Sequence, residues 1–125
     1  MRLLLDTHAF LWAVTGNRAL TAAARKLITS ADAVYVSAVS IWEVAIKAPL
    51  GKIVADCDEL EAAIESSGFI ELPVRARHAA AVARLAPLHK DPFDRLLVAQ
   101  AISEPLRLLS ADPQLIGYTE LVIRI

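Results

Sequence analysis

The sequence has little cysteine, no excess of positive charge and no long uncharged stretch, and each shortage excludes a class of protein. Its single cysteine, Cys57, cannot form an intrachain disulfide, and its acidic neighbours Asp56 and Asp58 disfavour a reactive thiolate. A net charge of −1 excludes the broad basic surface with which many proteins bind nucleic acid. Any contact with nucleic acid must therefore be local or depend on a metal ion.

The spacing of charged residues argues against membrane insertion. The longest stretch without Asp, Glu, Lys or Arg covers residues 7–17, well below the length of a membrane-spanning helix. Arg2 and Asp6 interrupt the only apolar stretch near the N-terminus, so we expect no signal peptide and a soluble, cytoplasmic protein. No repeat, low-complexity tract or linker divides the chain, and we expect one domain over residues 1–125.

Apolar side chains, in contrast, are abundant. Hydrophobic residues make up 56% of the chain, and the mean hydropathy is +0.48. A single domain of this length has limited interior in which to bury so much apolar surface. We therefore expect a protein partner or a homo-oligomer.

Short apolar runs alternate with helical patterns along the chain. Strands are predicted at 3–5, 33–37, 69–72, 106–109 and 121–123. Helices are predicted from Asp6 to Gly16 and at 21–28, 37–46 (or 40–46), 58–67, 75–85 and 92–101. Such alternation is typical of a parallel sheet covered by helices on both faces. The predicted fold is an α/β sandwich of three layers, α/β/α, with a central and mostly parallel sheet.

The stretch Lys90–Ala101 combines an apolar helix with two acids in its first turn. Pro92 suits the first helical position, so Asp91 is the expected N-cap and Asp94 lies at the third position. The remaining residues are apolar on almost every face, which predicts a buried helix. A charged first turn on a buried helix is the feature that a functional interpretation has to explain.

Three further acids follow predicted strands by a few residues. Asp6 follows 3–5, Glu43 follows 33–37, and Asp112 follows 106–109. In open α/β sheets, ligands bind outside the carboxyl ends of the strands. We expect Asp6, Glu43 and Asp112 at this edge, where the start of the helix that carries Asp94 can also lie.

Each acid also has a purely structural explanation. Asp6 can cap the first helix, Asp91 can cap the helix that carries Asp94, and Asp112 precedes a proline at a first helical position. Ser40-Ile41-Trp42-Glu43 fits a capping box, in which the serine and the glutamate satisfy each other's backbone N–H groups. A binding or assembly module whose acids are only helix caps is therefore an alternative to an enzyme.

Capping does not explain why four acids should meet at one edge of the sheet. Neighbouring carboxylates repel and raise one another's pKa unless a cation neutralises them. A cluster of oxygen ligands without cysteine favours Mg²⁺ or Mn²⁺ over Zn²⁺. Such an ion can activate water and balance charge on a phosphoryl group, so phosphodiester hydrolysis is the expected chemistry.

Four motifs together resemble a PIN-domain ribonuclease, and in particular the VapC-type toxins of bacterial toxin–antitoxin pairs. They are Leu5-Asp6-Thr7-His8, Ser40-Ile41-Trp42-Glu43, Asp91-Pro92-Phe93-Asp94-Arg95 and Ser110-Ala111-Asp112. The resemblance covers the whole chain in order. It implies an α/β/α sandwich, RNA cleavage that depends on Mg²⁺ or Mn²⁺, a homodimer, and inhibition by a VapB-type antitoxin. Contact with DNA is expected only through the antitoxin.

By the same resemblance, the acidic quartet of the family corresponds to Asp6, Glu43, Asp94 and Asp112. Asp6 and Asp94 are the expected principal metal ligands, and Glu43 and Asp112 complete the site directly or through water. Asp91 is interpreted as the cap that holds Asp94 in place. Thr7 and Ser110 adjoin the site, where they are turn and cap residues or hydrogen-bond partners of ligands.

The remaining candidates have ordinary explanations as well. Lys47 has the spacing of a helical ion pair with Glu43, although it or Arg95 can instead bind phosphate. His89 is expected in a solvated loop, with an approach to RNA as the alternative. His8 is expected to point away from the site, with contact to the substrate as the alternative. His78 is expected on a surface or in a packing role.

The aromatic residues have two interpretations. Trp12 and Trp42 are expected in the core. Phe10, Leu11 and Trp12 are alternatively part of a groove for an antitoxin helix.

Phosphoryl transfer through an aspartyl intermediate is the main enzymatic alternative. Receiver domains and haloacid-dehalogenase-like phosphatases also place acids at strand ends. A receiver domain would have a second acid beside Asp6, and a dehalogenase-like site would have an aspartate at position 8, where this chain has histidine. The sequence leaves open which RNA is cleaved and where.

Overall fold

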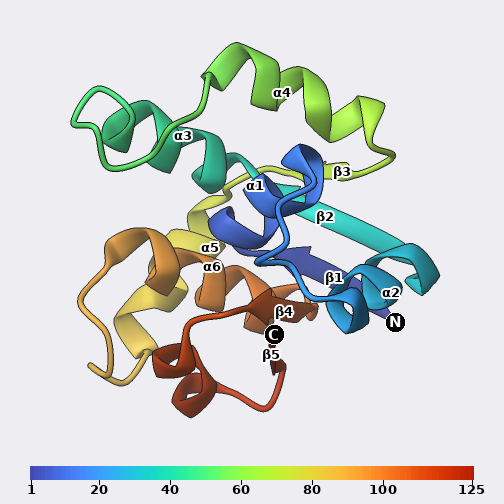
Figure 1. Ribbon diagram of the computed structural model, residues 1–125. Helices are drawn as coiled ribbons and strands as arrows, with labels where there is room; N and C mark the ends of the chain where they lie inside the picture. The colour runs from blue at the N-terminus through green and yellow to red at the C-terminus, as the bar shows by residue number, and fades with distance from the viewer.

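Five strands form one parallel sheet in the computed structural model, which describes all residues, 1–125 (Figure 1). Every neighbouring pair of strands is parallel, in the order β3-β2-β1-β4-β5. The strands are β1 (Arg2–Leu5), β2 (Ala33–Ser37), β3 (Ile70–Leu72), β4 (Arg107–Ser110) and β5 (Val122–Arg124). The expected α/β/α sandwich is confirmed, and its sheet is wholly parallel.

Helices connect the strands and cover both faces of the sheet. No helix has the length and apolar character needed to cross a membrane. The α-helices are α1 (Thr7–Thr15), α2 (Ala22–Ser30), α3 (Ala38–Lys47), α4 (Cys57–Ser66), α5 (Ala76–Ala81) and α6 (Pro92–Ser103). Two 3₁₀ helices, η1 (Val82–Arg84) and η2 (Pro113–Tyr118), complete the set.

The central strand β1 shows how the sheet divides the core. Successive side chains of a strand point to opposite faces. Leu3 and Leu5 accordingly pack with residues of α1, α2 and α4, whereas Leu4 packs with residues of α6 and η2. All three leucines are fully buried, as expected for a strand covered on both sides.

The order of the strands places a crevice between β1 and β4. The chain moves from β1 outward to β2 and β3, then crosses to β4 on the other side of β1. Ligands of open α/β sheets bind at the carboxyl edge where the strand order reverses in this way. Asp6 follows β1 directly and Asp112 follows β4 by two residues, so both lie at this point.

Helix α3 starts after Ser37, whose hydroxyl accepts the N–H of Val39, so the first of the two expected starts is confirmed and Ser40 does not cap the helix. Two other local expectations were wrong. The predicted helix 75–85 ends its α-helical part at Ala81 and continues as η1. Trp42 is 53% exposed and is not a core residue. Its indole meets the ring of Phe93 edge-on, with centroids 4.9 Å apart.

Candidate active site

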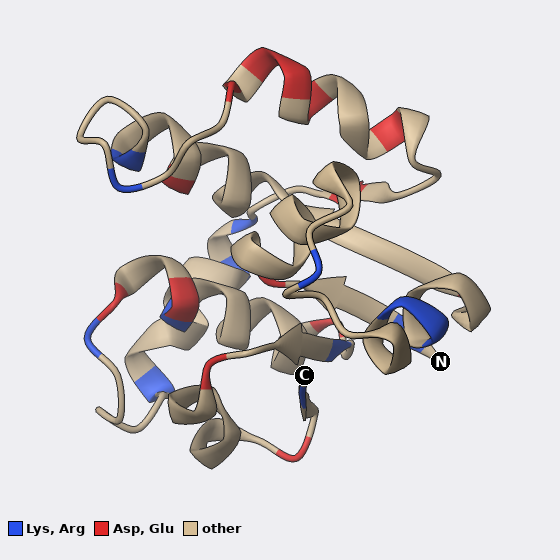
Figure 2. Ribbon diagram, viewed as in Figure 1, with Lys and Arg blue, Asp and Glu red and all other residues tan.

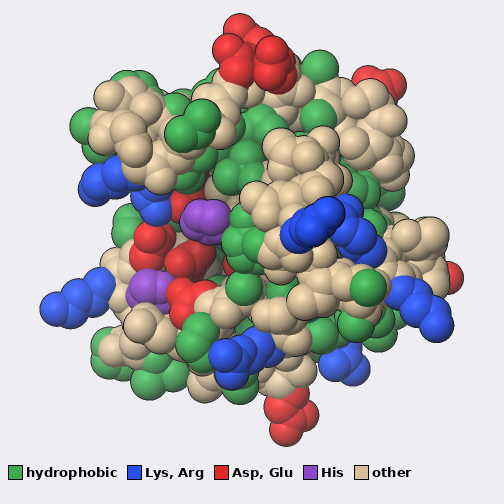
Figure 3. Space-filling model, in the orientation of Figure 1, with side chains coloured by type: hydrophobic (Ala, Val, Ile, Leu, Met, Phe, Trp, Pro, Cys, Tyr) green, Lys and Arg blue, Asp and Glu red, His purple; other side chains and the backbone are tan.

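An acidic cleft of about 320 Å³ opens at the carboxyl edge of the sheet. Figure 2 shows acidic residues on α3, around the start of α6 and after β4, besides others on α4, and Figure 3 shows acidic and histidine side chains gathered in a hollow. The cleft is lined by Asp6, His8, Trp12, Glu43, Lys47, Asp91, Asp94, Ala111 and Asp112. The structure therefore brings together the four acids of the predicted quartet, which come from four separate segments of the chain.

Asp6 connects β1 to α1 and is almost fully buried. Its Oδ1 accepts the N–H of Ala9 at 2.8 Å, so it caps α1 as the structural interpretation predicted. Burial raises the pKa of the Asp6 carboxyl above its ordinary value, and hydrogen bonds from Ser110 and Ala9 offset only part of this effect. A cation in the cleft would favour the ionised form of this carboxyl.

Glu43 projects from α3 into the cleft and is only 2% exposed. Thr7 Oγ1 donates to its Oε1 at 2.6 Å, and Lys47 Nζ lies 2.5 Å from its Oε2. The hydroxyl of Ser40 lies 3.0 Å from the same Thr7 oxygen. The predicted capping box is thus wrong: Ser40 and Glu43 lie inside the helix, and Glu43 pairs with side chains rather than with the backbone.

Asp91 is the N-cap of α6, as predicted. Its Oδ1 accepts the N–H groups of Phe93 and Asp94 at 2.8 and 3.1 Å, and its Oδ2 lies 3.3 Å from Lys47 Nζ. Burial opposes ionisation of Asp91, but the N–H of Asp94, the ammonium of Lys47 and the N–H of Phe93 lower its pKa below the ordinary value. Asp91 is therefore a stable carboxylate that fixes the first turn of α6.

Asp94 lies one turn further along and has the opposite electrostatic environment. Burial, followed by the charges of Asp91, Glu43 and Asp6, raises the pKa of Asp94 to about 7. The imidazole of His89, whose Nε2 lies 3.1 Å from Asp94 Oδ2, acts in the opposite direction on the pKa of Asp94. The side chain of Asp94 caps no helix, so its position has no structural role of the kind that capping gives to Asp91.

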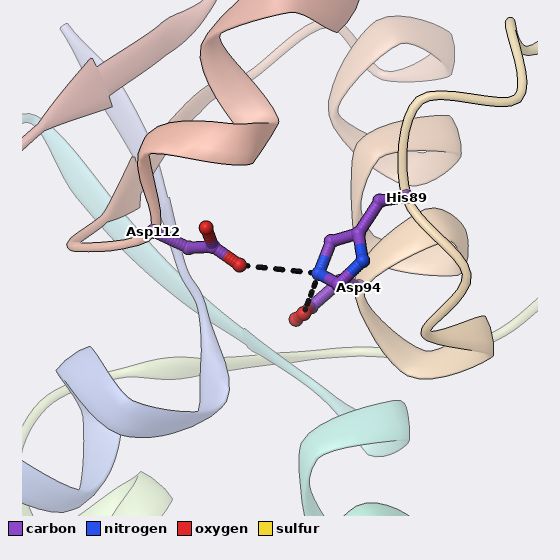
Figure 4. A group of neighbouring side chains, drawn as sticks. All are labelled: His89, Asp94 and Asp112. Atoms are coloured by element: carbon purple, nitrogen blue, oxygen red, sulfur yellow. Dashed lines mark hydrogen bonds and ion pairs between the residues drawn. The ribbon is translucent and has the colours of Figure 1, made fainter.

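His89 bridges Asp94 and Asp112 (Figure 4). Its Nε2 is 3.1 Å from Asp112 Oδ2 as well as from Asp94 Oδ2. Asp112 also uses its Oδ1 to accept the N–H of Gln114, and so caps η2 as expected. His89 lies in the loop before α6 as expected, but it is not solvated as expected, because its side chain is only 18% exposed and its imidazole sits between two acids of the site.

Arg95 holds the segment that carries His89. Its guanidinium donates to the carbonyl oxygens of Val82, Ala86 and His89 and to the hydroxyl of Tyr118, at 3.0 to 3.4 Å. These contacts favour a structural role over binding of phosphate. Lys47 forms the predicted ion pair with Glu43 and, in addition, contacts Asp91.

Two other histidines lie in different environments. His8 is exposed but lines the cleft, with its ring 5.9 Å from that of Trp12, so it does not point away as expected. His78 is buried between α5 and α6 and contacts Glu104 and Gln100. The packing role expected for His78 agrees with this placement.

A larger cleft of about 560 Å³ lies at the opposite edge, near the starts of β2 and β3. Its only carboxylate, Asp32, pairs with the N-terminal ammonium group. It therefore lacks the converging acids that distinguish the acidic cleft.

The donor set of the acidic cleft fits a hard divalent cation. The available ligands are carboxylate oxygens and the imidazole nitrogens of His8 and His89, and no cysteine lines the cleft. His89, Asp94 and Asp112 each offer one ligand atom, and these atoms lie within 4.8 Å of one another. Oxygen-rich sets of this kind suit Mg²⁺ and Mn²⁺, and the imidazole shifts the balance toward Mn²⁺.

Comparison with known proteins identifies the family of this chain. The family described as the PIN domain matches residues 3–120. The chain belongs to the PIN-domain family. No curated protein sequence matches it. The family expected from the four sequence motifs is thereby confirmed.

Several solved structures share the PIN fold of this chain. A chain of VapBC2 from Rickettsia felis, bound to a promoter DNA fragment, is 14% identical with a TM-score of 0.70, covering 100% of this chain and 98% of that one. A chain of DNA-bound VapBC from Salmonella typhimurium is 13% identical with a TM-score of 0.67, and the match covers 100% of this chain and 97% of that one. A chain of a toxin–antitoxin complex from Klebsiella pneumoniae is 18% identical with a TM-score of 0.66, and the match covers 98% of this chain and 99% of that one.

Proposed function

We propose that this PIN-domain protein is a metal-dependent endoribonuclease and the toxin of a VapBC-type toxin–antitoxin pair. The supporting observation is the meeting of Asp6, Glu43, Asp94 and Asp112 in one cleft at the carboxyl edge of the sheet. The likeness in fold to chains of VapBC complexes supports the toxin assignment. The substrate in this proposal is the phosphodiester backbone of RNA.

Asp6, Asp94 and Asp112 are the proposed ligands of Mg²⁺ or Mn²⁺, with Glu43 as the fourth acid of the site. When bound, the ion lowers the pKa of a water molecule and balances negative charge on the phosphoryl group. The buried Asp6 is held by the backbone of α1, and Asp94 is held by the cap that Asp91 provides. The chain therefore supplies acids whose positions are fixed before the ion arrives, which limits the reorganisation needed on binding.

A helix-capping role for the acids is the competing explanation, and it has direct support. Asp6, Asp91 and Asp112 each accept backbone N–H groups at a helix start. Asp94 and Glu43 do not, and both are placed where ionisation or pairing depends on other side chains in the cleft. These two residues distinguish the enzyme from a non-catalytic binding module.

A cleavage assay tests the proposed activity. Purified protein is incubated with structured RNAs in Mg²⁺ or Mn²⁺ and, in parallel, in EDTA. We expect cleavage that EDTA abolishes and that Asp94→Asn removes. Asp58→Asn is the matched control, because Asp58 is an exposed acid in the first turn of another helix, α4. Cleavage that is indifferent to EDTA and to Asp94→Asn would refute the proposal.

We also propose a VapB-type antitoxin and a second copy of the chain as partners. Large apolar side chains on α3 and the segment after it support this, since Trp42, Ile46 and Leu50 are all at least 46% exposed. DNA contact is proposed only through the antitoxin. Light scattering of the purified protein should give the mass of a dimer, and a monomer at micromolar concentration would contradict that part of the proposal.

A further inference from the structure

Lys47 occupies the space between two carboxylates of the acidic cleft. Its Nζ lies 2.5 Å from Glu43 Oε2 and 3.3 Å from Asp91 Oδ2, and 5.3 Å from the centre of the Phe93 ring. The side chain of Lys47 is only 22% exposed. An ammonium group that is paired twice and partly shielded from water is a fixed part of the site.

The remaining oxygens of these two carboxylates also have protein donors. Glu43 Oε1 accepts the hydroxyl of Thr7, and Asp91 Oδ1 accepts two backbone N–H groups of α6. Every carboxylate oxygen of Glu43 and Asp91 is therefore hydrogen-bonded within the protein. A metal ion that took Glu43 as a direct ligand would have to share an oxygen that already accepts a strong, charge-assisted hydrogen bond from Lys47 or Thr7. Such an ion would also lie close to the ammonium of Lys47, which repels it.

The other acids of the cleft have no such internal cation. Asp94 has only the shared imidazole of His89 as a nearby basic partner, and that imidazole also faces Asp112. No lysine or arginine forms a salt bridge with Asp94 or Asp112. The one lysine that lines the cleft thus lies on the side that Glu43 and Asp91 form.

We propose that Lys47 is the built-in counter-ion of Glu43 and Asp91 and that it restricts the cleft to one divalent ion, held on the side of Asp6, Asp94 and Asp112. On this view Glu43 is a positioning residue and not a direct metal ligand. The inference rests on the proposed function, because it concerns the metal site of the proposed nuclease. To the proposed function it adds the number of bound ions, the side of the cleft on which the ion lies, and the residue that limits the number to one.

Counting bound Mn²⁺ tests this inference without measuring activity. Free Mn²⁺ is measured by electron paramagnetic resonance during titration of the purified full chain. We expect one ion per chain in the wild type and in Lys47→Arg, whose guanidinium can pair with both carboxylates. Lys47→Met should bind two, because Glu43 and Asp91 lose their cation. Lys90→Met, which removes an exposed lysine beside the cleft, should bind one.

Thermal unfolding, measured once in EDTA and once in saturating Mn²⁺, provides a second test. In EDTA, Lys47→Met should unfold at a lower temperature than Lys90→Met. Mn²⁺ should raise the unfolding temperature of Lys47→Met by more than it raises that of the wild type. Two ions per wild-type chain, or one ion and an unchanged Mn²⁺ response in Lys47→Met, would overturn the inference.

Glu43→Gln keeps the inference testable if Lys47→Met does not fold. This variant should still bind one ion, whereas Asp94→Asn should bind none; loss of the ion in both would overturn the inference. The outcomes also separate the two proposals. A wild type that cleaves RNA in an EDTA-sensitive way but binds two ions overturns only the inference, whereas a wild type that binds no divalent ion overturns the proposed function as well.

Discussion

Glu43 and Asp91 on one side of the acidic cleft differ from Asp94 and Asp112 on the other in the basic side chain that contacts them. We call the first pair the Lys47 side and the second pair the His89 side. On the Lys47 side, a lysine ammonium contacts both carboxylates at 2.5 and 3.3 Å. On the His89 side, one imidazole nitrogen lies 3.1 Å from each.

Glu43 and Asp91 stabilise the fold through their pairing with Lys47, whereas an ionised Asp94 destabilises it. Desolvation alone would lower the pKa of Lys47, but its pairing with Glu43 and Asp91 raises that pKa above the ordinary value. The pKa of Asp94 is raised to about 7, so ionising this carboxyl at neutral pH costs free energy. Functional sites commonly contain groups with strongly shifted pKa values, such as Asp94, because a bound ligand can supply the compensating charge that the protein lacks.

The largest expected effect compares one substitution on each side. Asp94→Asn removes a proposed ligand and should lower the rate of RNA cleavage in Mn²⁺ by about 100-fold or more. Asp91→Asn keeps a good helix cap and leaves Lys47 paired with Glu43, so its rate should stay much closer to that of the wild type. Rates of both variants on one labelled RNA measure the contrast. Equal losses would remove the distinction between the two sides.

The same comparison predicts stability changes of opposite sign. In EDTA at about pH 8, Glu43→Gln should lower the free energy of unfolding by about 1.5–3 kcal/mol, because it breaks a charged hydrogen bond to Lys47. Asp94→Asn should raise it, because it removes a carboxylate that is costly to ionise above a pKa of about 7. Urea unfolding of both variants provides the measurement. A lower stability for Asp94→Asn would contradict the account.

The effect of Asp94 should also depend on pH in one direction. The folded pKa of about 7 lies above the ordinary value of 3.8, so the folded state binds more protons than the unfolded state between these values. The contribution of Asp94 to stability is present below about pH 4 and is lost as the pH rises to about 7. Unfolding temperatures of wild type and Asp94→Asn in EDTA should therefore diverge over this range, in favour of the variant. Curves that stay parallel would show that the pKa of Asp94 is not raised.

The smallest expected effect isolates the capping role of Asp91. Asp91→Ala removes the acceptor for two backbone N–H groups, and such caps contribute about 1 kcal/mol. Asp91→Asn retains an acceptor, so it should lose only a few tenths of that value. Thermal unfolding in EDTA compares the two. If asparagine proves as destabilising as alanine, the charge of Asp91 and not its cap is what stabilises α6.

Much of the fold follows from local pattern. The apolar run at residues 3–5 predicts a buried central strand, and β1 is buried on both faces. Proline at a first helical position placed Asp91 as the cap and Asp94 in the first turn, because these preferences depend on neighbours in sequence alone. The quartet was brought to one edge by the rule that parallel strands end together.

The errors concern directions and distances that local pattern does not determine. The direction of His89 depends on Arg95 and Tyr118, which hold its backbone from outside the loop. The four-residue spacing of Glu43 and Lys47 predicts their pairing, but Asp91 lies 44 residues from Lys47 along the chain, so its contact with Lys47 is not predictable from spacing. Helix α3 is apolar on several faces, so its sequence does not disclose that Trp42 faces outward. Ser37 and Ser40 are both plausible caps, and only the end of β2 decides between them.

A crystal structure with Mn²⁺ tests the division of the cleft most directly. Anomalous scattering at the manganese edge locates each ion without reference to activity. The account predicts a single peak per chain beside the carboxylates of Asp6, Asp94 and Asp112, with Lys47 still in contact with Glu43 and Asp91. A peak between Glu43 and Asp91, with Lys47 displaced, would contradict it.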